Sequence, residues 1–174
     1  ISSAENPAAF EKVLTAVSTT IIDWLQAQLD CLSAPQGILL LDDLVGMVSK
    51  RQYEKLIHPH LSRIFDHFNG MLRIYHNDTP CKHLYSSLTE ANFDVFNFSH
   101  TADMGEVKAI MGHKVALMGN VAPLDLGMRG TAQEVYQAAI HCLNKAAEGG
   151  GMILSFGGGV SPNTPAENID ALLQ

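Results

Sequence analysis

Hydrophobic and polar positions follow two alternating patterns along the chain. In residues 7–30, apolar side chains recur in steps of three and four, which predicts one long amphipathic helix. Asn6 can cap this helix and Pro7 suits its first turn. The stretch SAPQG (33–37) breaks the pattern, and the apolar run 38–41 follows it. A run without polar positions predicts a short strand that is buried on both faces, as in a parallel sheet.

The same alternation recurs as far as the last residue. The predicted strands are 71–76, 93–98, 114–120 and 152–156, and the predicted helices are 50–68, 80–90, 103–111, 131–148 and a last one from 165 onward. Thr131 and Glu134 form a capping box at the start of one helix. Five strands, each followed by a helix, indicate a parallel sheet with right-handed crossovers.

Two architectures fit this alternation, a doubly wound sheet and a (β/α)8 barrel. Polar residues or glycines follow every predicted strand, at 42–43, 76–78, 99–100, 119–120 and 157–159. All carboxyl ends of the strands converge on one mouth only in a barrel, so this distribution favours the barrel. A barrel needs eight strands. We therefore expect about five β/α units from the C-terminal portion of a (β/α)8 TIM barrel.

An incomplete barrel leads to a further expectation about assembly. The first residues, ISSAENPAAF, contain neither an initiator Met nor a signal-like core, and they are typical of a position within a longer chain. Five strands alone leave open sheet edges and part of a site. We expect the 174-residue chain to be inactive alone, and to need barrel completion by another chain or by a homo-oligomer.

Composition narrows the range of partners. The net charge is -7 with only 11 Lys and Arg residues, which argues against nucleic acid. No apolar run reaches the ~18 residues that span a bilayer, so no membrane association is expected. The chain has three cysteines that lie far apart in the sequence, Cys31, Cys81 and Cys142. This small number and wide spacing argue against a disulfide framework and favour a cytoplasmic location.

The loop after the second predicted strand combines residues that can bind a metal. His76, Asp78 and Cys81 lie within six positions, and imidazole, carboxylate and thiolate are all zinc ligands. A structural alternative is that Asp78 and Thr79 cap the helix beginning near Pro80, with Cys81 packed in its first turn. His76, at the strand tip, is a candidate catalytic residue and metal ligand.

Three other strand ends offer candidate site residues. Asp42 and Asp43 can act as acid and base or bind a cationic substrate, although a loop aspartate can also cap a helix near Ser49. Asn120 can hydrogen-bond a substrate or serve as a turn residue. The triplet Gly157, Gly158 and Gly159 allows a ligand to approach the backbone, or makes a tight turn; it does not match a phosphate-binding loop.

Five stretches together resemble one known family. They are 39–64, 74–79 (IYHNDT), 93–98 (FDVFNF), 115–123 (VALMGNVAP) and 153–173. In order and spacing they resemble the C-terminal part of the uroporphyrinogen decarboxylase superfamily, which includes the porphyrin-pathway decarboxylase and corrinoid-dependent methyltransferases. The resemblance implies a (β/α)8 barrel, of which these strands are the fourth to the eighth. It also places Asp42 at an acidic position of the family.

The resemblance implies a branch as well. Gly158 stands where the decarboxylase has a histidine, and Ala122 where it has an aspartate. His76 matches the first zinc ligand of the methyltransferases, whereas Asp78 and Gly158 stand where they have cysteines. Apart from these positions, the matching stretches are more similar to the methyltransferase branch than to the decarboxylase. The implied function is transfer of a methyl group between a small substrate and a cobamide on a partner corrinoid protein, with zinc as cofactor. The alternative is uroporphyrinogen decarboxylase, which acts on a tetrapyrrole.

Overall fold

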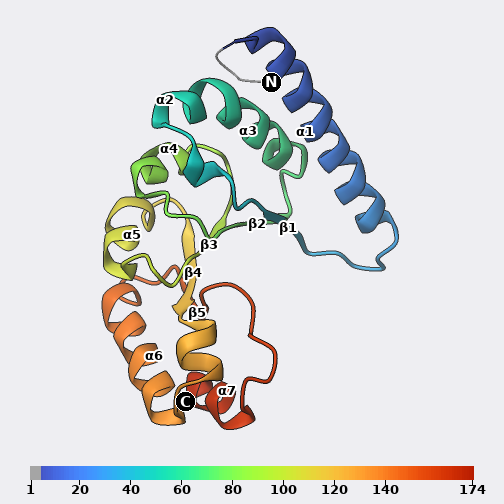
Figure 1. Cartoon of the computed structure of the whole chain (residues 1–174). Helices are drawn as coiled ribbons and strands as arrows, with labels where there is room; N and C mark the ends of the chain where they lie inside the picture. The colour runs from blue at the N-terminus through green and yellow to red at the C-terminus, as the bar shows by residue number, and fades with distance from the viewer. Residues whose placement is uncertain (1–4) are drawn as a thin grey trace.

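Helices and strands alternate through residues 5–174, the part of the chain that the computed structural model describes (Figure 1). The strands are β1 (Gly37–Leu41), β2 (Leu72–Asn77), β3 (Val95–Phe98), β4 (Ala116–Val121) and β5 (Met152–Phe156). The α-helices are α1 (Pro7–Asp30), α2 (Lys50–Gln52), α3 (His58–His67), α4 (Tyr85–Leu88), α5 (Met104–Met111), α6 (Ala132–Ala146) and α7 (Ala166–Leu173). Short 3-10 turns lie at Val45–Met47 and Lys82–Leu84, and π-helical turns at Tyr53–Ile57 and Pro123–Met128.

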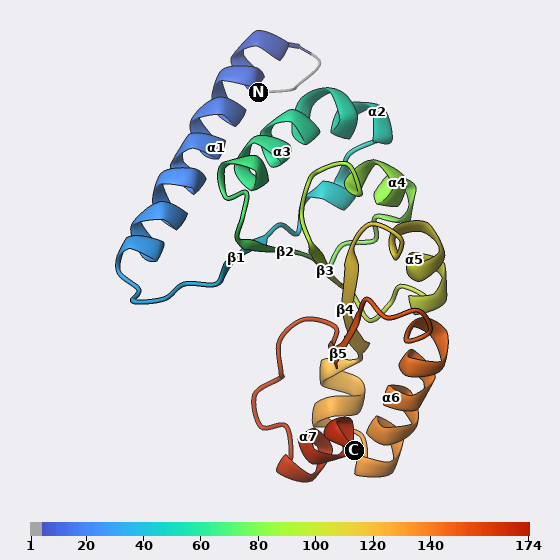
Figure 2. The ribbon, with the colours of Figure 1, turned by 180° about the vertical axis from the view of Figure 1, so that it is seen from behind.

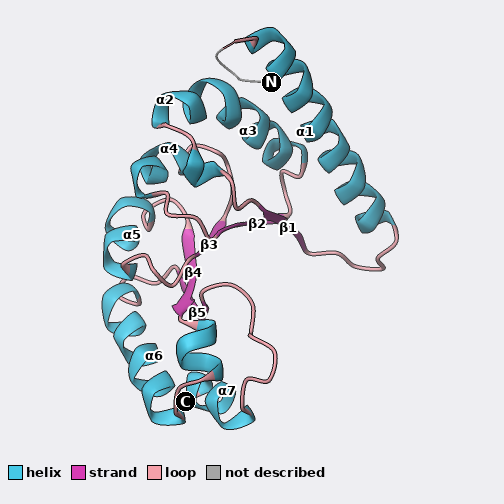
Figure 3. Cartoon of the chain, viewed as in Figure 1, coloured by secondary structure: helices cyan, strands magenta, loops and turns pink. Residues whose placement is uncertain are grey.

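The strands form one parallel sheet in the order β1-β2-β3-β4-β5. A doubly wound sheet reverses its strand order at a switch point, whereas a barrel adds each strand beside the previous one. Helices α3 to α6 lie along one side of the curved sheet, as Figures 2 and 3 show. This arrangement is an arc of a barrel, and it confirms the predicted architecture.

The two faces of the sheet differ in what covers them. On the helix side, Tyr75 of β2 packs against Phe65 of α3, and Phe96 of β3 packs against Tyr85 of α4. These aromatic side chains are almost fully buried and form the centre of the core. On the other face, Leu41 of β1 is 65% exposed, so the predicted burial of this strand on both faces is wrong. The helix side therefore holds the fold together, and the open face is available to ligands or to further protein.

One row of residues crosses the open face through all five strands. Leu41 pairs with His76, His76 with Asn97, Asn97 with Met118, and Met118 with Ile153. Partners in register on neighbouring parallel strands point to the same side of the sheet. Two polar side chains, His76 and Asn97, therefore lie side by side in an otherwise apolar row.

The predicted elements agree with the structure except in a few segments. The capping box of Thr131 and Glu134 is present at the start of α6. The helix predicted over 80–90 is shorter, because a 3-10 turn replaces its first part and the chain turns back at Asn92, whose φ is 64°. The π-helical turn at Pro123–Met128 was not predicted, since its six residues are too few to show a helical period. Within the described residues, no helix combines the length and the apolar character needed to cross a bilayer.

Candidate functional site

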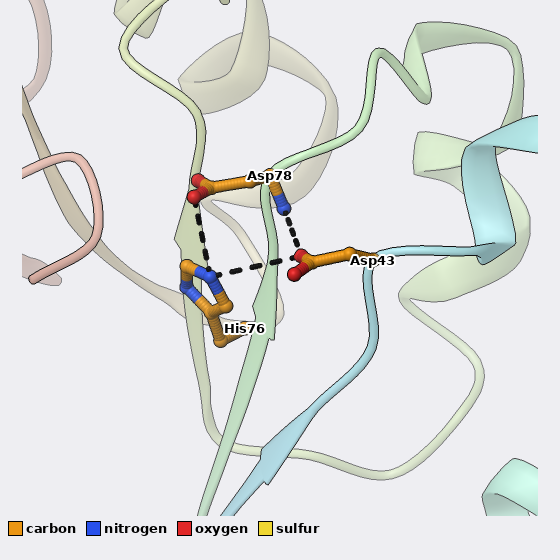
Figure 4. Close-up of side chains that lie close together, drawn as sticks. All are labelled: Asp43, His76 and Asp78. Atoms are coloured by element: carbon orange, nitrogen blue, oxygen red, sulfur yellow. Dashed lines mark hydrogen bonds and ion pairs between the residues drawn. The ribbon is translucent and has the colours of Figure 1, made fainter.

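Three ligand-type side chains meet at the carboxyl ends of β1 and β2. His76 Nε2 lies 3.5 Å from Asp78 Oδ2 and 3.8 Å from Asp43 Oδ1 (Figure 4). One donor atom from each residue lies within 4.8 Å of the other two. We call Asp43, His76 and Asp78 the His-Asp cluster.

The strands position this cluster by simple geometry. His76 stands on β2, while Asp43 and Asp78 lie just beyond the ends of two neighbouring strands. The backbone N–H of Asp78 donates to Asp43 Oδ1 at 3.0 Å, which holds the two loops together. The imidazole is mostly buried, with 11% of its side chain exposed, whereas the carboxylates are 62% and 47% exposed. A ligand can therefore reach the carboxylates from solvent and meet a fixed imidazole.

Asn97 is a site residue that the sequence did not reveal. Its Oδ1 lies 2.5 Å from His76 Nδ1, and its Nδ2 donates to the carbonyl of Met118 at 2.8 Å. Asn97 is 7% exposed. The signal available in the sequence was one polar residue between Phe96 and Phe98 in a buried strand. Because buried amides need partners, such a residue indicates a specific hydrogen bond.

Asp42 is close to the cluster in sequence, but its side chain hydrogen-bonds to nearby backbone groups instead of joining the cluster. Its Oδ1 accepts from the backbone N–H groups of Leu44 and Val45, and its Oδ2 accepts from the Tyr75 hydroxyl. Asp42 thus holds the backbone that leads into the turn at Val45–Met47, while Ser49 caps α2. Both carboxylate oxygens of Asp42 therefore have partners within the fold, and Asp43 is the aspartate of this pair that joins His76.

Cys81 is not brought to the cluster, which corrects its prediction as a metal ligand. Its side chain packs in the core with 2% exposure, and this burial raises the pKa of the thiol to about 12. A neutral thiol is a poor zinc ligand. The alternative prediction is right for Cys81, which packs at the start of the turn at Lys82–Leu84. It is wrong for Asp78 and Thr79 as caps, because the Thr79 hydroxyl bonds Asn77 and Gly46, and Asp78 faces His76.

Asn120 lies at a strand end but faces the helices. Its amide nitrogen donates to the carbonyls of Ser99 and Ala102, and its oxygen accepts from the Cys142 thiol of α6. These bonds tie the loop after β3 to α6, so the structure does not bring Asn120 to His76. A pocket of about 370 Å³ lies beside it.

The glycine triplet follows β5 and reaches the cluster through its middle residue. A Cβ on Gly158 would lie 3.3 Å from Asp78 Oδ2 and 3.7 Å from His76 Cε1. Gly157 packs against the backbone of His100, and a Cβ on Gly159 would meet nothing within 4 Å. Of the three predicted substrate-binding glycines, Gly158 is the one that borders the His-Asp cluster.

Comparison with known proteins assigns the chain to a family. The model of the family described as "Uroporphyrinogen decarboxylase (URO-D)" matches residues 3–174, almost the whole chain. The chain belongs to the URO-D family. Curated relatives named "Uroporphyrinogen decarboxylase" include those of Trichormus variabilis, 27% identical over 170 residues, and of Coxiella burnetii, 26% identical over 176 residues. The alignments cover 94% and 98% of this chain but 46% and 47% of those relatives.

A solved structure of this family's fold agrees with the arc of strands. A "methyltransferase from Methanosarcina mazei" superposes with a TM-score of 0.82 at 20% identity, covering 94% of this chain and 47% of that one. At this identity the likeness is one of fold. The URO-D chain described here therefore spans about half the length of the relatives it matches, and its five strands are part of a TIM-barrel-like URO-D fold.

Proposed function

We propose that this URO-D family protein is a methyltransferase whose His-Asp cluster holds a divalent metal ion, with zinc as the expected metal. The observation that carries the proposal is the convergence of His76 Nε2 with the carboxylates of Asp43 and Asp78. One imidazole nitrogen and two carboxylates form a donor set that zinc accepts.

The donor set fits a metal that activates an oxygen- or nitrogen-bound methyl group. Thiolate ligands suit a metal that activates a thiol substrate. Cys81 is the only cysteine close to the cluster residues in sequence, and its side chain is buried away from the cluster. Harder oxygen donors leave a metal more electron-poor, and a zinc ion held there would supply a Lewis acid. His76 and the two aspartates would hold and orient such a metal, and Gly158 leaves room beside them.

The open face of the sheet supports a substrate that is largely apolar. Leu41 and Met118 belong to the same row as His76, and Leu41 is 65% exposed. A methyl group makes no hydrogen bonds with water, so it loses none when it lies among apolar side chains. We propose that a small compound with an oxygen- or nitrogen-bound methyl group is the donor and that a reduced cobamide on a corrinoid protein is the acceptor. The cobamide would supply the electron pair for the new bond to the methyl group, and the donor would leave as the demethylated alcohol or amine.

Zinc binding by the full-length protein tests the metal site. Chelator-treated protein should bind one zinc ion by calorimetry, and His76→Ala and Asp78→Asn should each weaken binding at least tenfold. Asp125→Asn is the matched control, because this exposed carboxylate pairs only with Arg129 within the described residues. Equal zinc affinity in wild type and His76→Ala, or no binding by either, refutes the metal site.

Methyl transfer to reduced cobalamin tests the reaction. The full-length protein should methylate cob(I)alamin, followed by absorbance, from a methylated amine or ether, and His76→Ala should not. Wild-type protein with bound zinc that transfers no methyl group from a panel of such donors would argue against the reaction while leaving the metal site standing.

Uroporphyrinogen decarboxylation is the second candidate, because the curated relatives carry that name. Gly158 and Ala122 depart from that enzyme's family pattern at two positions, and Gly158 has no side chain to offer beside the cluster. We expect no coproporphyrinogen from uroporphyrinogen with the full-length protein. Formation of that product in a chromatographic assay would favour the decarboxylase instead.

A further inference from the structure

The hydrogen bonds of Asn97 settle which nitrogen of His76 carries a proton. The carbonyl of Met118 can only accept, so the group of Asn97 that faces it at 2.8 Å is the amide NH2. The amide oxygen therefore faces His76 Nδ1 at 2.5 Å, and an amide oxygen can only accept. His76 Nδ1 must be the donor of that bond.

The register of the sheet makes this arrangement rigid. His76, Asn97 and Met118 are successive partners across β2, β3 and β4, so no loop intervenes between the imidazole and the carbonyl. His76 and Asn97 are 9% and 7% exposed, so water does not compete freely for these bonds. The imidazole is held in one orientation from its Nδ1 side, and its Nε2 points to Asp43 and Asp78.

We propose that Asn97 is a positioning residue that fixes His76 as the Nδ1–H form and so presents the Nε2 lone pair to the His-Asp cluster. This role adds to the proposed function. The part of it that concerns metal binding rests on that proposed function. Without Asn97, a neutral imidazole would be better satisfied by donating from Nε2 to the carboxylate of Asp78 or Asp43. That choice of tautomer would block the nitrogen that faces the two carboxylates.

The first experiment reads the tautomer directly in the metal-free full-length protein. Nitrogen-15 spectra of histidine-labelled protein distinguish a protonated from an unprotonated Nδ1, and His76→Ala identifies the signal. Wild type should show a protonated Nδ1, and Asn97→Leu should show loss of that proton. An unprotonated Nδ1 in wild type, or an unchanged Nδ1 in Asn97→Leu, would overturn the proposal.

Two further variants separate positioning from general damage to the fold. Asn97→Asp keeps an acceptor toward His76 but loses the donor to Met118, so it should retain the protonated Nδ1. Asn168→Leu removes a buried amide that donates only to the carbonyls of Gly127 and Gly130, and it should leave the His76 signal unchanged. If Asn97→Asp loses the proton as completely as Asn97→Leu, the acceptor role is refuted.

The second experiment measures zinc affinity in the same variants. Loss of a partner that orients a metal-binding histidine typically weakens binding about 10- to 100-fold, and we expect this for Asn97→Leu. Asn168→Leu should bind zinc as wild type does. Equal affinity in Asn97→Leu and wild type contradicts the positioning role. If wild type itself binds no zinc, the proposed metal site fails, and the tautomer spectra still decide the role of Asn97.

Discussion

Gly158 lies directly against the carboxylate of Asp78, although the two residues are 80 positions apart in the sequence. A Cβ on Gly158 would stand 3.3 Å from Asp78 Oδ2, and the φ of Gly158 is 109°, a conformation that favours glycine. The loop after β5 thus closes over the cluster at the end of β2 by means of a residue without a side chain.

Replacement of Gly158 by alanine should therefore be costly. We expect Gly158→Ala to lower the free energy of unfolding by about 1–2 kcal/mol, because an L-residue is strained at this φ. Gly159→Ala is the matched control: its Cβ would meet nothing within 4 Å, and its effect should stay within about 0.5 kcal/mol. Urea unfolding of the full-length variants measures both free energies. Similar losses of stability in Gly158→Ala and Gly159→Ala would contradict the interpretation that position 158 needs a glycine.

The three cysteines should differ sharply in reactivity. Cys31 is exposed, whereas Cys81 and Cys142 are buried, and burial raises the pKa of both buried thiols. Because the thiolate is the reactive form, Cys31 should be alkylated first at pH 8 and the other two only after unfolding. Peptide mapping by mass spectrometry after timed iodoacetamide treatment checks this. Labelling of Cys81 as fast as Cys31 would show that its thiol is accessible.

The ion pair of Arg73 and Asp94 should make stability depend on pH. Arg73 donates through Nε and Nη2 to the two oxygens of Asp94, and these bonds hold the pKa of Asp94 below its usual value. A lowered folded-state pKa means that Asp94 stabilises the fold above its unfolded pKa of about 3.9. This contribution is lost as the pH falls through that value toward the folded-state pKa.

Asp94→Asn tests this pair. Asp94 is 39% exposed, so solvent screening reduces the effect to about 1 kcal/mol at pH 7. The difference in free energy of unfolding from wild type should shrink below about pH 4. Asp125→Asn, from a pair in which both side chains are more than 60% exposed, serves as control and should show little difference at either pH. A difference for Asp94→Asn that grows on acidification would have the wrong sign.

The open face of the sheet should make the 174-residue chain associate when it is studied alone. Leu39 and Leu41 are 51% and 65% exposed on β1, an edge strand whose backbone is unpaired on one side. Sedimentation at micromolar concentration should show oligomers, and Leu41→Lys should reduce them. A compact monomer of 18.9 kDa that unfolds cooperatively would show that this face needs no cover.

Local pattern alone determined most of the architecture. The switch between helical steps and short apolar runs predicts the order of the elements, and the polar residues after each run indicate a single functional edge. His76, Asp78 and Gly158 could be chosen in this way, because each follows or ends a strand and carboxyl ends of parallel strands share one edge.

Only the tertiary structure decided which side chains meet at that edge. Asp43 rather than Asp42 joins His76, Asn120 turns toward α6, and Cys81 enters the core. Asn97, hidden in an apolar strand, is the residue that holds the imidazole. For Asp42, Asp43 and Asn97 the physical reason is that side chains alternate between the two faces along a strand, while strand register depends on packing between distant segments. Asn120 and Cys81 are placed by hydrogen bonds and burial against segments distant in the sequence. Side-chain alternation can be recognised in a short stretch of sequence, whereas strand register cannot.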